Sequence, residues 1–365
     1  MMEKLIQTIY HGSNINLSNT GFSQTSETFL HELYSQLQTI TVPKYSIDNI
    51  NEMKYGQHFN SIPNNIKSYI KKTKMFSTYI KSKIGSKHVE IYFMHPNKFF
   101  NDDIINLVLK WLVYAYSIAP DGCSRQLRVF IYLTPLKKEI PDFEVIDHNH
   151  ANNAFTFACI ENNEINIFRE EEWFKVFIHE TIHALGIDFS QFNHGRISNP
   201  VLKNIYNINI DFHLHEAYCE TLATFFNVCL RHQHQSFKVF YKNLKKKLFL
   251  ESVFSLYQSA KILNHSGIDY KQLIRGKSPQ KYNEKTPLFS YFIIKSTLFY
   301  NLDAFLISRS SKGIVFKELH LKSFLELIQR MYKKIPYVKD LTKIQSMISN
   351  FKHPQAKSLR FSLFG

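Results

Sequence analysis

The sequence predicts an α+β fold, with a mixed β-sheet in the first half of the chain and a mainly helical C-terminal lobe. Runs rich in β-branched and aromatic residues, separated by turn residues, lie between positions 75 and 168, whereas amphipathic helical periodicity dominates positions 237–344. A hydrophobic content of 44% in 365 residues is enough for a substantial core. We therefore divide the chain into a peripheral N-terminal region (residues 1–60), a subdomain with the sheet (residues 61–190) and a helical subdomain (residues 191–365).

A hairpin is the first predicted element of the sheet. Residues 75–84 and 88–94 are β-prone runs joined at Gly85, a residue that suits a tight turn. A helix is predicted over residues 102–118, because Asn101 is a suitable N-cap and acidic residues occupy the first turn. The sheet is therefore expected to have a helix packed beside its first hairpin.

A second group of strands leads towards the middle of the chain. Residues 127–133 are almost continuously apolar and predict a largely buried strand. Residues 153–160 and 164–168 predict another hairpin, with its turn at Asn162-Asn163. This hairpin is expected to supply an antiparallel edge strand.

Helices are predicted for most of the remaining chain. Residues 170–185 have helical periodicity and end before Gly186, a loop is expected over residues 187–210, and a second helix over residues 211–231. Further amphipathic stretches predict helices that are separated by a loop at residues 275–287; they cover residues 27–37, 248–263, 288–305 and 319–331.

The chain is strongly basic, with a formal net charge of +15. Such a charge attracts acidic partners at long range. The lysines are spread along the whole chain, however, and only Lys245-Lys246-Lys247 forms a compact run. No nucleic-acid-binding motif is present, so we interpret the charge as a generally basic surface.

The cysteines and the apolar runs indicate a soluble protein. The four cysteines show no Cys-x-x-Cys spacing, which predicts reduced and mostly buried thiols in a reducing compartment. The N-terminus lacks the apolar stretch of a secretory signal, and the longest apolar run, residues 104–119, is interrupted by Lys110 and is too short to span a bilayer. We therefore expect no transmembrane segment and a cytoplasmic location.

The central motif is His179-Glu180-Thr181-Ile182-His183. On a helix, two histidines four residues apart project from the same face and can bind one zinc ion. Glu180 is then placed to take a proton from a water molecule whose pKa the metal has lowered. Chance occurrence of such a short motif is on the order of a few per cent in a chain with 17 histidines, so its surroundings must support it.

A catalytic zinc site needs a third protein ligand. The metzincin pattern would place a ligand at position 189, which is Phe189 here, and Asp188 is one residue out of register. Glu216 and Glu220 in the next predicted helix are four residues apart, so both carboxylates project from one helical face. One of them can bind the zinc ion while the other holds a ligand imidazole by its second nitrogen.

These motifs together resemble the gluzincins, the thermolysin-like zinc metallopeptidases. The resemblance implies a zincin-like fold, with Glu216 as the third zinc ligand and Glu220 as the partner of His179; the reverse assignment of the two acids stays open. It also implies that an edge strand beginning Asn153-Ala154 binds the backbone of the substrate, which unpaired edge groups can do. It covers residues 153–225.

The resemblance also requires a group that stabilises the oxyanion, for which histidine and tyrosine are suitable. The candidates near the ligand helix or in the helical lobe are His213, His215, Tyr218 and Tyr291. More loosely, residues 167–177 and 290–295 are similar to segments of uncharacterised zincin-like proteins of large DNA viruses, which adds a virion to the expected locations.

The expected function is a zinc-dependent hydrolase, with zinc as its cofactor and peptide bonds of a polypeptide substrate as its target. The motif itself specifies activated water and leaves the substrate open, so hydrolysis of another bond remains an alternative. A second alternative is a catalytically inactive, basic binding or structural protein with a zincin-like fold, associated with a virion.

Overall fold

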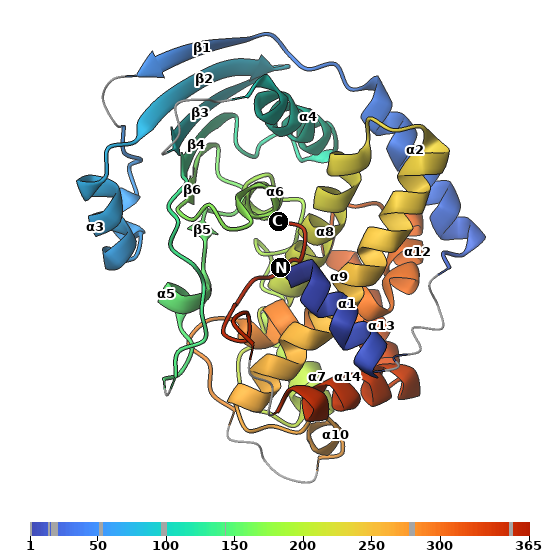
Figure 1. Ribbon diagram of the computed structural model, residues 1–365. Helices are drawn as coiled ribbons and strands as arrows, with labels where there is room; N and C mark the ends of the chain where they lie inside the picture. Colours follow the sequence, from blue (N-terminus) through green and yellow to red (C-terminus); the bar gives the residue numbers. More distant parts are fainter. Residues whose placement is uncertain are drawn as a thin grey trace.

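The computed structural model describes residues 2–13, 15, 21–50, 54–95, 101–142, 144–276, 282–349 and 353–365. The fold is α+β, with a mixed six-stranded sheet beside a helical half, as the sequence predicts (Figure 1). The strands are β1 (Tyr45–Ile50), β2 (Phe76–Ile84), β3 (Lys87–His95), β4 (Gln126–Tyr132), β5 (Ala154–Phe155) and β6 (Asn162–Ile167).

Helices make up most of the remaining described chain. Three short segments depart from α-helical geometry: the 3-10 helices η1 (Phe59–Ser61) and η3 (Glu318–His320) and the π-helix η2 (Phe289–Ile294). The α-helices are α1 (Met2–Ser13), α2 (Gln24–Thr39), α3 (Asn64–Lys72), α4 (Asp102–Ile118), α5 (His148–Ala151), α6 (Trp173–Ala184), α7 (Gly195–Tyr206), α8 (Leu214–His232), α9 (Phe237–His265), α10 (Tyr270–Leu273), α11 (Lys295–Tyr300), α12 (Leu302–Lys312), α13 (Leu321–Met331) and α14 (Ile335–Ile348).

The strands lie in the order β1-β2-β3-β4-β6-β5. The pairs β1–β2, β2–β3 and β6–β5 are antiparallel, whereas β3–β4 and β4–β6 are parallel. The predicted first hairpin is confirmed: β2 and β3 are joined at Gly85, whose φ of +58° suits glycine. The helix predicted after it is confirmed as α4, and the Asn101 side chain accepts a hydrogen bond from the Asp103 N–H at 2.8 Å.

The second predicted hairpin is only partly correct. β5 and β6 do pair in antiparallel fashion, but β5 has two residues, and Asn162 and Asn163 belong to β6 instead of the turn. The Asn163 side chain is buried and donates to the carbonyls of Phe157 at 2.7 Å and Ala184 at 3.4 Å. Because these bonds tie the preceding loop to the end of α6, the chain after Phe155 leaves the sheet.

The segment predicted as a loop over residues 187–210 contains α7. Pro200 lies inside this helix and removes one backbone donor. The helix forms nevertheless because its buried residues, including Leu202 and Tyr206, pack it against α13. In the helical half, the predicted helix over residues 288–305 is divided at Asn301, with η2 and α11 before it and α12 after it. The loop predicted at residues 275–287 includes residues 277–281, which lie outside the described ranges.

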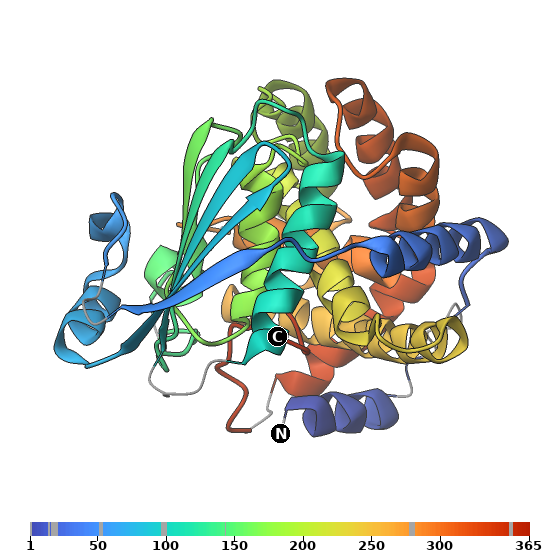
Figure 2. The ribbon, with the colours of Figure 1, turned by 90° about the horizontal axis from the view of Figure 1, so that it is seen from above.

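The sheet separates two layers of helices. Figure 2 shows α4 and α6 on one face of the sheet and α3 on the other. The residues of α3 pack with Tyr92, Phe130 and Tyr132 in a small apolar cluster of their own. The described residues before Lys54 contribute to both halves: α1 packs against α9 and α14, α2 against α12, and β1 forms one edge of the sheet. The motif helix α6 therefore lies between the sheet and the helical half.

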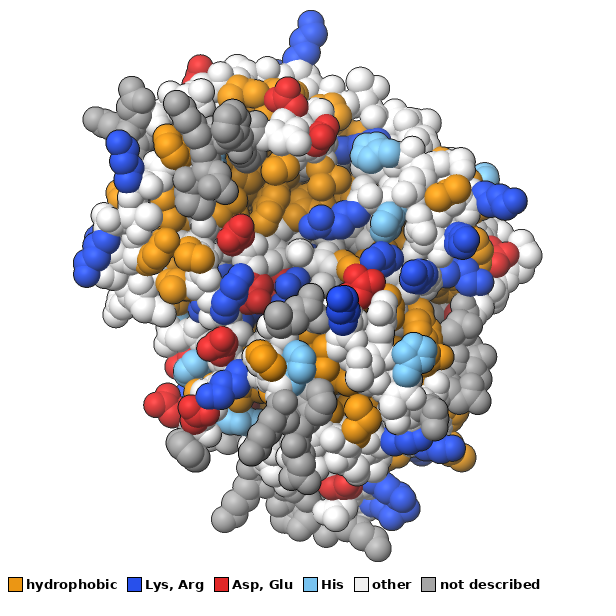
Figure 3. All heavy atoms as spheres, in the orientation of Figure 1, with side chains coloured by type: hydrophobic (Ala, Val, Ile, Leu, Met, Phe, Trp, Pro, Cys, Tyr) orange, Lys and Arg blue, Asp and Glu red, His pale blue; other side chains and the backbone are white. Residues whose placement is uncertain are grey.

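The described surface matches a generally basic protein. In Figure 3, Lys and Arg side chains are dispersed over the face shown and alternate with acidic and uncharged groups. Among the helices that the structure describes, none combines the length and the apolar character needed to span a membrane.

Candidate metal centre

Two neighbouring helices carry the predicted ligands. α6 is buried at every position from Phe174 to Ala184, because it is covered by β6 and β5 on one side and by α8 on the other. The 3.6-residue period of α6 places His179 and His183 on the same side, facing α8. Glu216 lies in the first turn of α8 and faces them.

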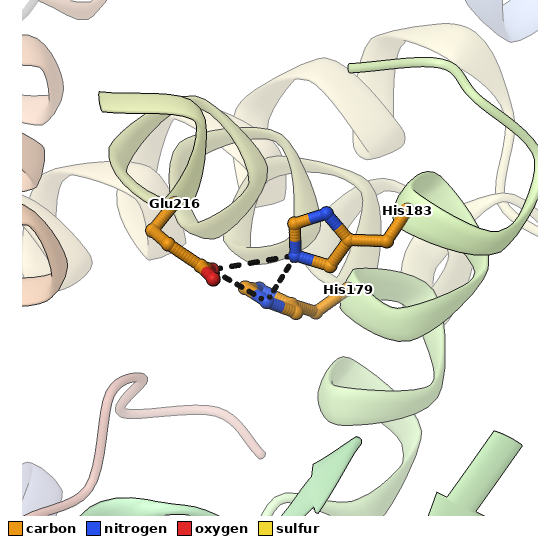
Figure 4. Close-up of side chains that lie close together, drawn as sticks. All are labelled: His179, His183 and Glu216. Atoms are coloured by element: carbon orange, nitrogen blue, oxygen red, sulfur yellow. Dashed lines mark hydrogen bonds and ion pairs between the residues drawn. The ribbon is translucent and has the colours of Figure 1, made fainter. Parts of the chain in front are cut away.

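Three ligand atoms converge on one point (Figure 4). The Nε2 atoms of His179 and His183 are 3.0 Å apart, and the Oε2 atom of Glu216 is 3.2 Å from the first and 3.3 Å from the second. A tetrahedral zinc ion with bonds of about 2.0–2.1 Å has ligand atoms about 3.3 Å apart. The triangle therefore has the size that one zinc ion requires.

Two further carboxylates orient the imidazoles. Glu220 Oε1 is 2.9 Å from His179 Nδ1, and Asp188 Oδ2 is 2.9 Å from His183 Nδ1. His183 Nδ1 is hydrogen-bonded to Asp188, whereas His179 Nδ1 is near Glu220 without hydrogen-bond geometry. A carboxylate beside Nδ1 favours a proton on that nitrogen, which leaves a lone pair on the Nε2 atom near Glu216. Three electron-rich atoms in contact repel one another unless a cation lies between them. The donor set thus fits a divalent metal ion.

Glu216 is in the form that a metal ligand needs. Burial works against its charge, but the neighbouring imidazoles of His183 and His179 hold the pKa of Glu216 well below its ordinary value. Of the two acids considered from sequence, Glu216 faces both Nε2 atoms, whereas Glu220 contacts the outer nitrogen of His179. The geometry therefore corresponds to Glu216 on the metal and Glu220 behind His179.

Asp188 is a member of the candidate site that the sequence pattern does not indicate. The metzincin register offers it only as a direct ligand, one residue out of position, whereas the structure places it behind His183. Its side chain is fully buried and also accepts hydrogen bonds from the N–H and hydroxyl of Ser190. His183, Asp188 and Cys219 also lie close enough to hold an ion. Because His183 Nδ1 is already bonded to Asp188, we interpret this second group as support for the first.

Glu180 lies close to the ligands on the same helix. Its side chain is 8% exposed, and burial raises the pKa of its carboxyl, although His179 and His183 act in the opposite direction. A carboxyl with a raised pKa is a better proton acceptor than an ordinary one. Position and environment both suit the role of general base.

Of the four residues proposed to stabilise the oxyanion, Tyr218 is committed to another contact. Its hydroxyl donates to the carbonyl of Ile314 in the helical half. His213 is exposed, and its ring contacts that of His215 with centroids 5.8 Å apart. Burial lowers the pKa of His213, and the nearby carboxylate of Glu216 acts in the opposite direction.

The other two candidates border the site. His215 Nε2 is 3.6 Å from Glu216 Oε1, and its Nδ1 is 2.8 Å from His194 Nε2. Tyr291 is 7% exposed, and its ring centroid is 6.4 Å from that of His179. Burial raises the pKa of Tyr291, and the carboxylates of Glu216, Glu220 and Glu180 add to the rise. Tyr291 also lies in the π-helix η2, a geometry found often at functional sites.

The edge strand is present, but its first residue has a structural role. The Asn153 side chain donates to the carbonyl of Glu171 at 2.7 Å, and its own carbonyl accepts from Phe168 at 2.9 Å. Ala154 pairs with Ile167, and β5 is the last strand of the sheet order. Asn153 therefore fixes the start of the motif helix, and the outer edge of β5 is the side on which a further strand can add.

Access to the metal position is narrow. The side chains of His179, His183 and Glu216 are only 8%, 10% and 15% exposed. Three surface cavities among the described residues are lined by other parts of the chain and by none of the three ligands. One of them lies between α9, α11 and α12. The three ligand side chains are thus mostly buried.

A disulfide supports the C-terminal end of the motif helix, and the prediction of four reduced thiols is wrong. Cys123 and Cys159 are bonded, while Cys219 and Cys229 are free and buried. Spacing along the sequence could not reveal a pair separated by 36 residues. A Cβ atom at Gly186, which has a φ of +63°, would lie 3.0 Å from Cys123 Sγ. The disulfide therefore packs directly on the residue that ends α6.

Comparisons of the chain with protein-family models, with curated proteins and with solved structures found no match. The similarity to gluzincins therefore depends on the motif residues alone. The α+β fold is characterised by the strand order of its mixed sheet. The metal centre likewise depends on the contacts among His179, His183, Glu216 and the two carboxylates behind them.

Proposed function

We propose that this protein is a zinc-dependent hydrolase that cleaves peptide bonds in a polypeptide substrate, a metallopeptidase of gluzincin type with a zincin-like fold. The observation that supports it most directly is the convergence of two imidazole nitrogens and one carboxylate oxygen at separations of 3.0–3.3 Å. Each imidazole has a carboxylate behind it, an arrangement typical of metal-binding histidines.

The residues then have distinct roles. His179, His183 and Glu216 hold the zinc ion, which when bound polarises a carbonyl group and makes a water molecule more acidic. Glu180 takes a proton from the attacking water and delivers it to the leaving amine nitrogen. Tyr291 donates a hydrogen bond to the oxygen that becomes negatively charged.

The substrate class follows from the edge strand. An extended polypeptide can pair with the outer edge of β5, where the sheet ends beside α6. Hydrogen bonds to backbone groups would hold the substrate irrespective of its side chains. This is the feature that favours a peptide over another hydrolysable substrate.

Metal analysis and one conservative substitution test the proposal. We expect about one zinc per purified chain and loss of zinc in His183→Ala. Glu180→Gln should keep zinc but lower peptide cleavage by about 10²- to 10⁴-fold, because only the proton acceptor is removed. Glu170→Gln, the same change at an exposed position just before α6, is the matched control and should retain activity.

A zinc content below about 0.2 per chain after reconstitution would contradict the proposal, since structural and catalytic zinc sites bind far more completely. Equal cleavage of a peptide library by the unmodified protein and by Glu180→Gln would contradict the catalytic part alone. The two measurements thus separate metal binding from hydrolysis.

A second candidate is a catalytically inactive, basic binding or structural protein. It is favoured by the narrow access, with ligand side chains 8–15% exposed, and by the net charge of +15. It predicts bound zinc without cleavage, and binding to DNA that persists above about 0.2 M salt, where a merely basic surface loses affinity steeply.

A further inference from the structure

Residues 357–364 form an irregular segment, with bends at Phe361 and Leu363, whose backbone is held by buried side chains. Glu172 accepts hydrogen bonds from the N–H groups of Phe361 and Ser362 at 3.0 and 2.5 Å. Glu251 accepts from the next two N–H groups at 3.0 Å each. Four carbonyls of the segment, those of Ser358, Arg360, Phe361 and Phe364, accept from the side chains of Lys261, Gln258, Lys295 and Asn227. Its position is therefore closely defined.

Phe361 is the residue of this segment that contacts Tyr291. Its ring stacks on Tyr291 with centroids 5.0 Å apart and lies edge-to-face with Phe292 at 4.9 Å. The Nζ atoms of Lys138 and Lys175 lie 3.9 and 4.9 Å from the ring centroid. One aromatic ring thus contacts two ammonium groups and the tyrosine beside His179.

Two series of contacts link the Phe361 ring to His179. One passes through Tyr291, whose ring centroid is 6.4 Å from that of His179. The other passes through Lys175, which pairs with Glu220 at 2.5 Å, and Glu220 contacts His179 Nδ1 at 2.9 Å. Phe361 has no direct contact with the ligands among the described residues, so any effect it has must be transmitted by these neighbours.

We propose that Phe361 is a positioning residue of the metal centre, which holds Tyr291 in place for oxyanion stabilisation. This inference rests on the proposed hydrolase function. Tyr291 lies in the π-helix η2, and the Phe361 ring stacked on it limits the positions that the Tyr291 ring can take. The position of the Phe361 ring therefore controls the activity of the site.

The kinetic test uses Phe361→Leu, which keeps apolar volume but removes the stacked ring. We expect kcat to fall about tenfold to a hundredfold with KM changed less than about twofold and zinc retained, because a misplaced donor affects the transition state. Phe364→Leu is the matched control: this ring lies below Lys247, 4.0 Å from its Nζ atom, and its loss should leave kcat unchanged.

A double-mutant cycle separates positioning from general loosening. In the Tyr291→Phe background the hydroxyl is absent, so Phe361→Leu should change kcat by less than about twofold. An equal loss in both backgrounds would overturn the inference, because Phe361 would then act without Tyr291.

A second readout does not depend on catalysis. The protein is labelled with 3-fluorotyrosine, and the ¹⁹F resonance of Tyr291 is identified by its absence in Tyr291→Phe. Phe361→Leu should shift or average this resonance, whereas Phe364→Leu should not. If the unmodified protein cleaves no peptide yet the resonance responds, the hydrolase proposal fails and the positioning role stands. An unchanged resonance in Phe361→Leu overturns the positioning role, whether or not peptides are cleaved.

Discussion

The two ends of the motif helix α6 are held in different ways. At its N-terminal end, Lys138 pairs with Glu172 at 2.6 Å and Lys175 with Glu220 at 2.5 Å, and all four side chains are at most 2% exposed. At its C-terminal end, Ala184 is held through its carbonyl by the Ser124 hydroxyl at 2.7 Å, and the disulfide packs on Gly186. Charged side chains from distant segments hold one end, while a covalent bond and neutral hydrogen bonds hold the other.

This difference determines what each end responds to. A buried ion pair is stable only while both partners are present, because a single charge left in the interior carries a large desolvation penalty. Neutral backbone bonds and a disulfide do not respond to pH but depend on the loop conformation and on the disulfide staying oxidised. The N-terminal end should therefore be sensitive to single charge changes, and the C-terminal end to reduction.

The largest effect should come from removing one buried cation. Lys138→Met leaves Glu172 charged and without its ammonium partner, and we expect a loss of about 3–5 kcal/mol in the free energy of unfolding. Lys137→Met, the same change at the exposed neighbouring residue, is the control. Urea denaturation of both variants measures the difference, and equal stability of the two would show that the pair does not hold this end of α6.

A net effect of about 3 kcal/mol at low pH is expected at Lys261, which donates to the Ser358 carbonyl: its lowered pKa destabilises the fold by about 5 kcal/mol, and the hydrogen bond offsets part of this. Burial lowers the pKa of Lys261 to about 7, whereas in the unfolded chain it is near 10.5. Between these values the unfolded chain binds a proton that the folded protein does not, so the destabilisation grows as pH falls from 10 to 7 and is constant below.

Lys261→Met removes this destabilisation and loses one hydrogen bond. Its stability should exceed that of the unmodified protein by about 3 kcal/mol at pH 6, and the advantage should disappear as pH approaches 10. Lys238→Met, at an exposed position of the same helix, should show no such pH dependence. Denaturation curves at several pH values provide the measurement, and a pH-independent difference at Lys261 would contradict the lowered pKa.

Removal of the disulfide should destabilise the other end by about 3 kcal/mol, as expected for closure of a loop of 36 residues. Cys123→Ala with Cys159→Ala, compared by urea denaturation with the unmodified protein, measures this loss. Without reductant, the unfolded chain should present two reactive thiols, those of Cys219 and Cys229, and four after reduction. Four thiols in the unreduced protein would show that this end is held by packing alone.

The parts of the site that sequence predicts are those set by local geometry. A spacing of four residues on a helix places two side chains on the same face, which is sufficient to pair His179 with His183 and Glu216 with Glu220. The bounds of α4 were predictable for a similar reason, since the Asn101 cap and the acidic first turn are local signals.

The parts that sequence does not predict depend on contacts between distant residues. Glu172 accepts hydrogen bonds from Phe361 and Ser362, 189 and 190 residues later, and no local pattern indicates that contact. Asp188 is close in sequence to His183, but its role depends on how the chain turns after Gly186. The turn brings its carboxylate behind the imidazole.

The smallest effect on stability should come from Asp188, one of the two carboxylates behind the imidazoles at the two ends. Asp188→Asn and Glu220→Gln keep the shape of the side chain but remove its charge, and each should weaken zinc binding by about 10- to 100-fold in a competition titration with a chelator. Their effects on stability should differ. Glu220→Gln leaves Lys175 buried without its carboxylate, whereas Asp188 has no Lys or Arg partner among the described residues.

Stability of the zinc-free protein separates these cases. Glu220→Gln should lower the free energy of unfolding by several kcal/mol, as expected when one partner of a buried ion pair is removed. Asp188→Asn should lower it by about 1 kcal/mol, since the amide can still accept from Ser190. Comparable losses in both variants would contradict the distinction between the two ends, because they would show that charge holds the C-terminal end as strongly as the N-terminal one.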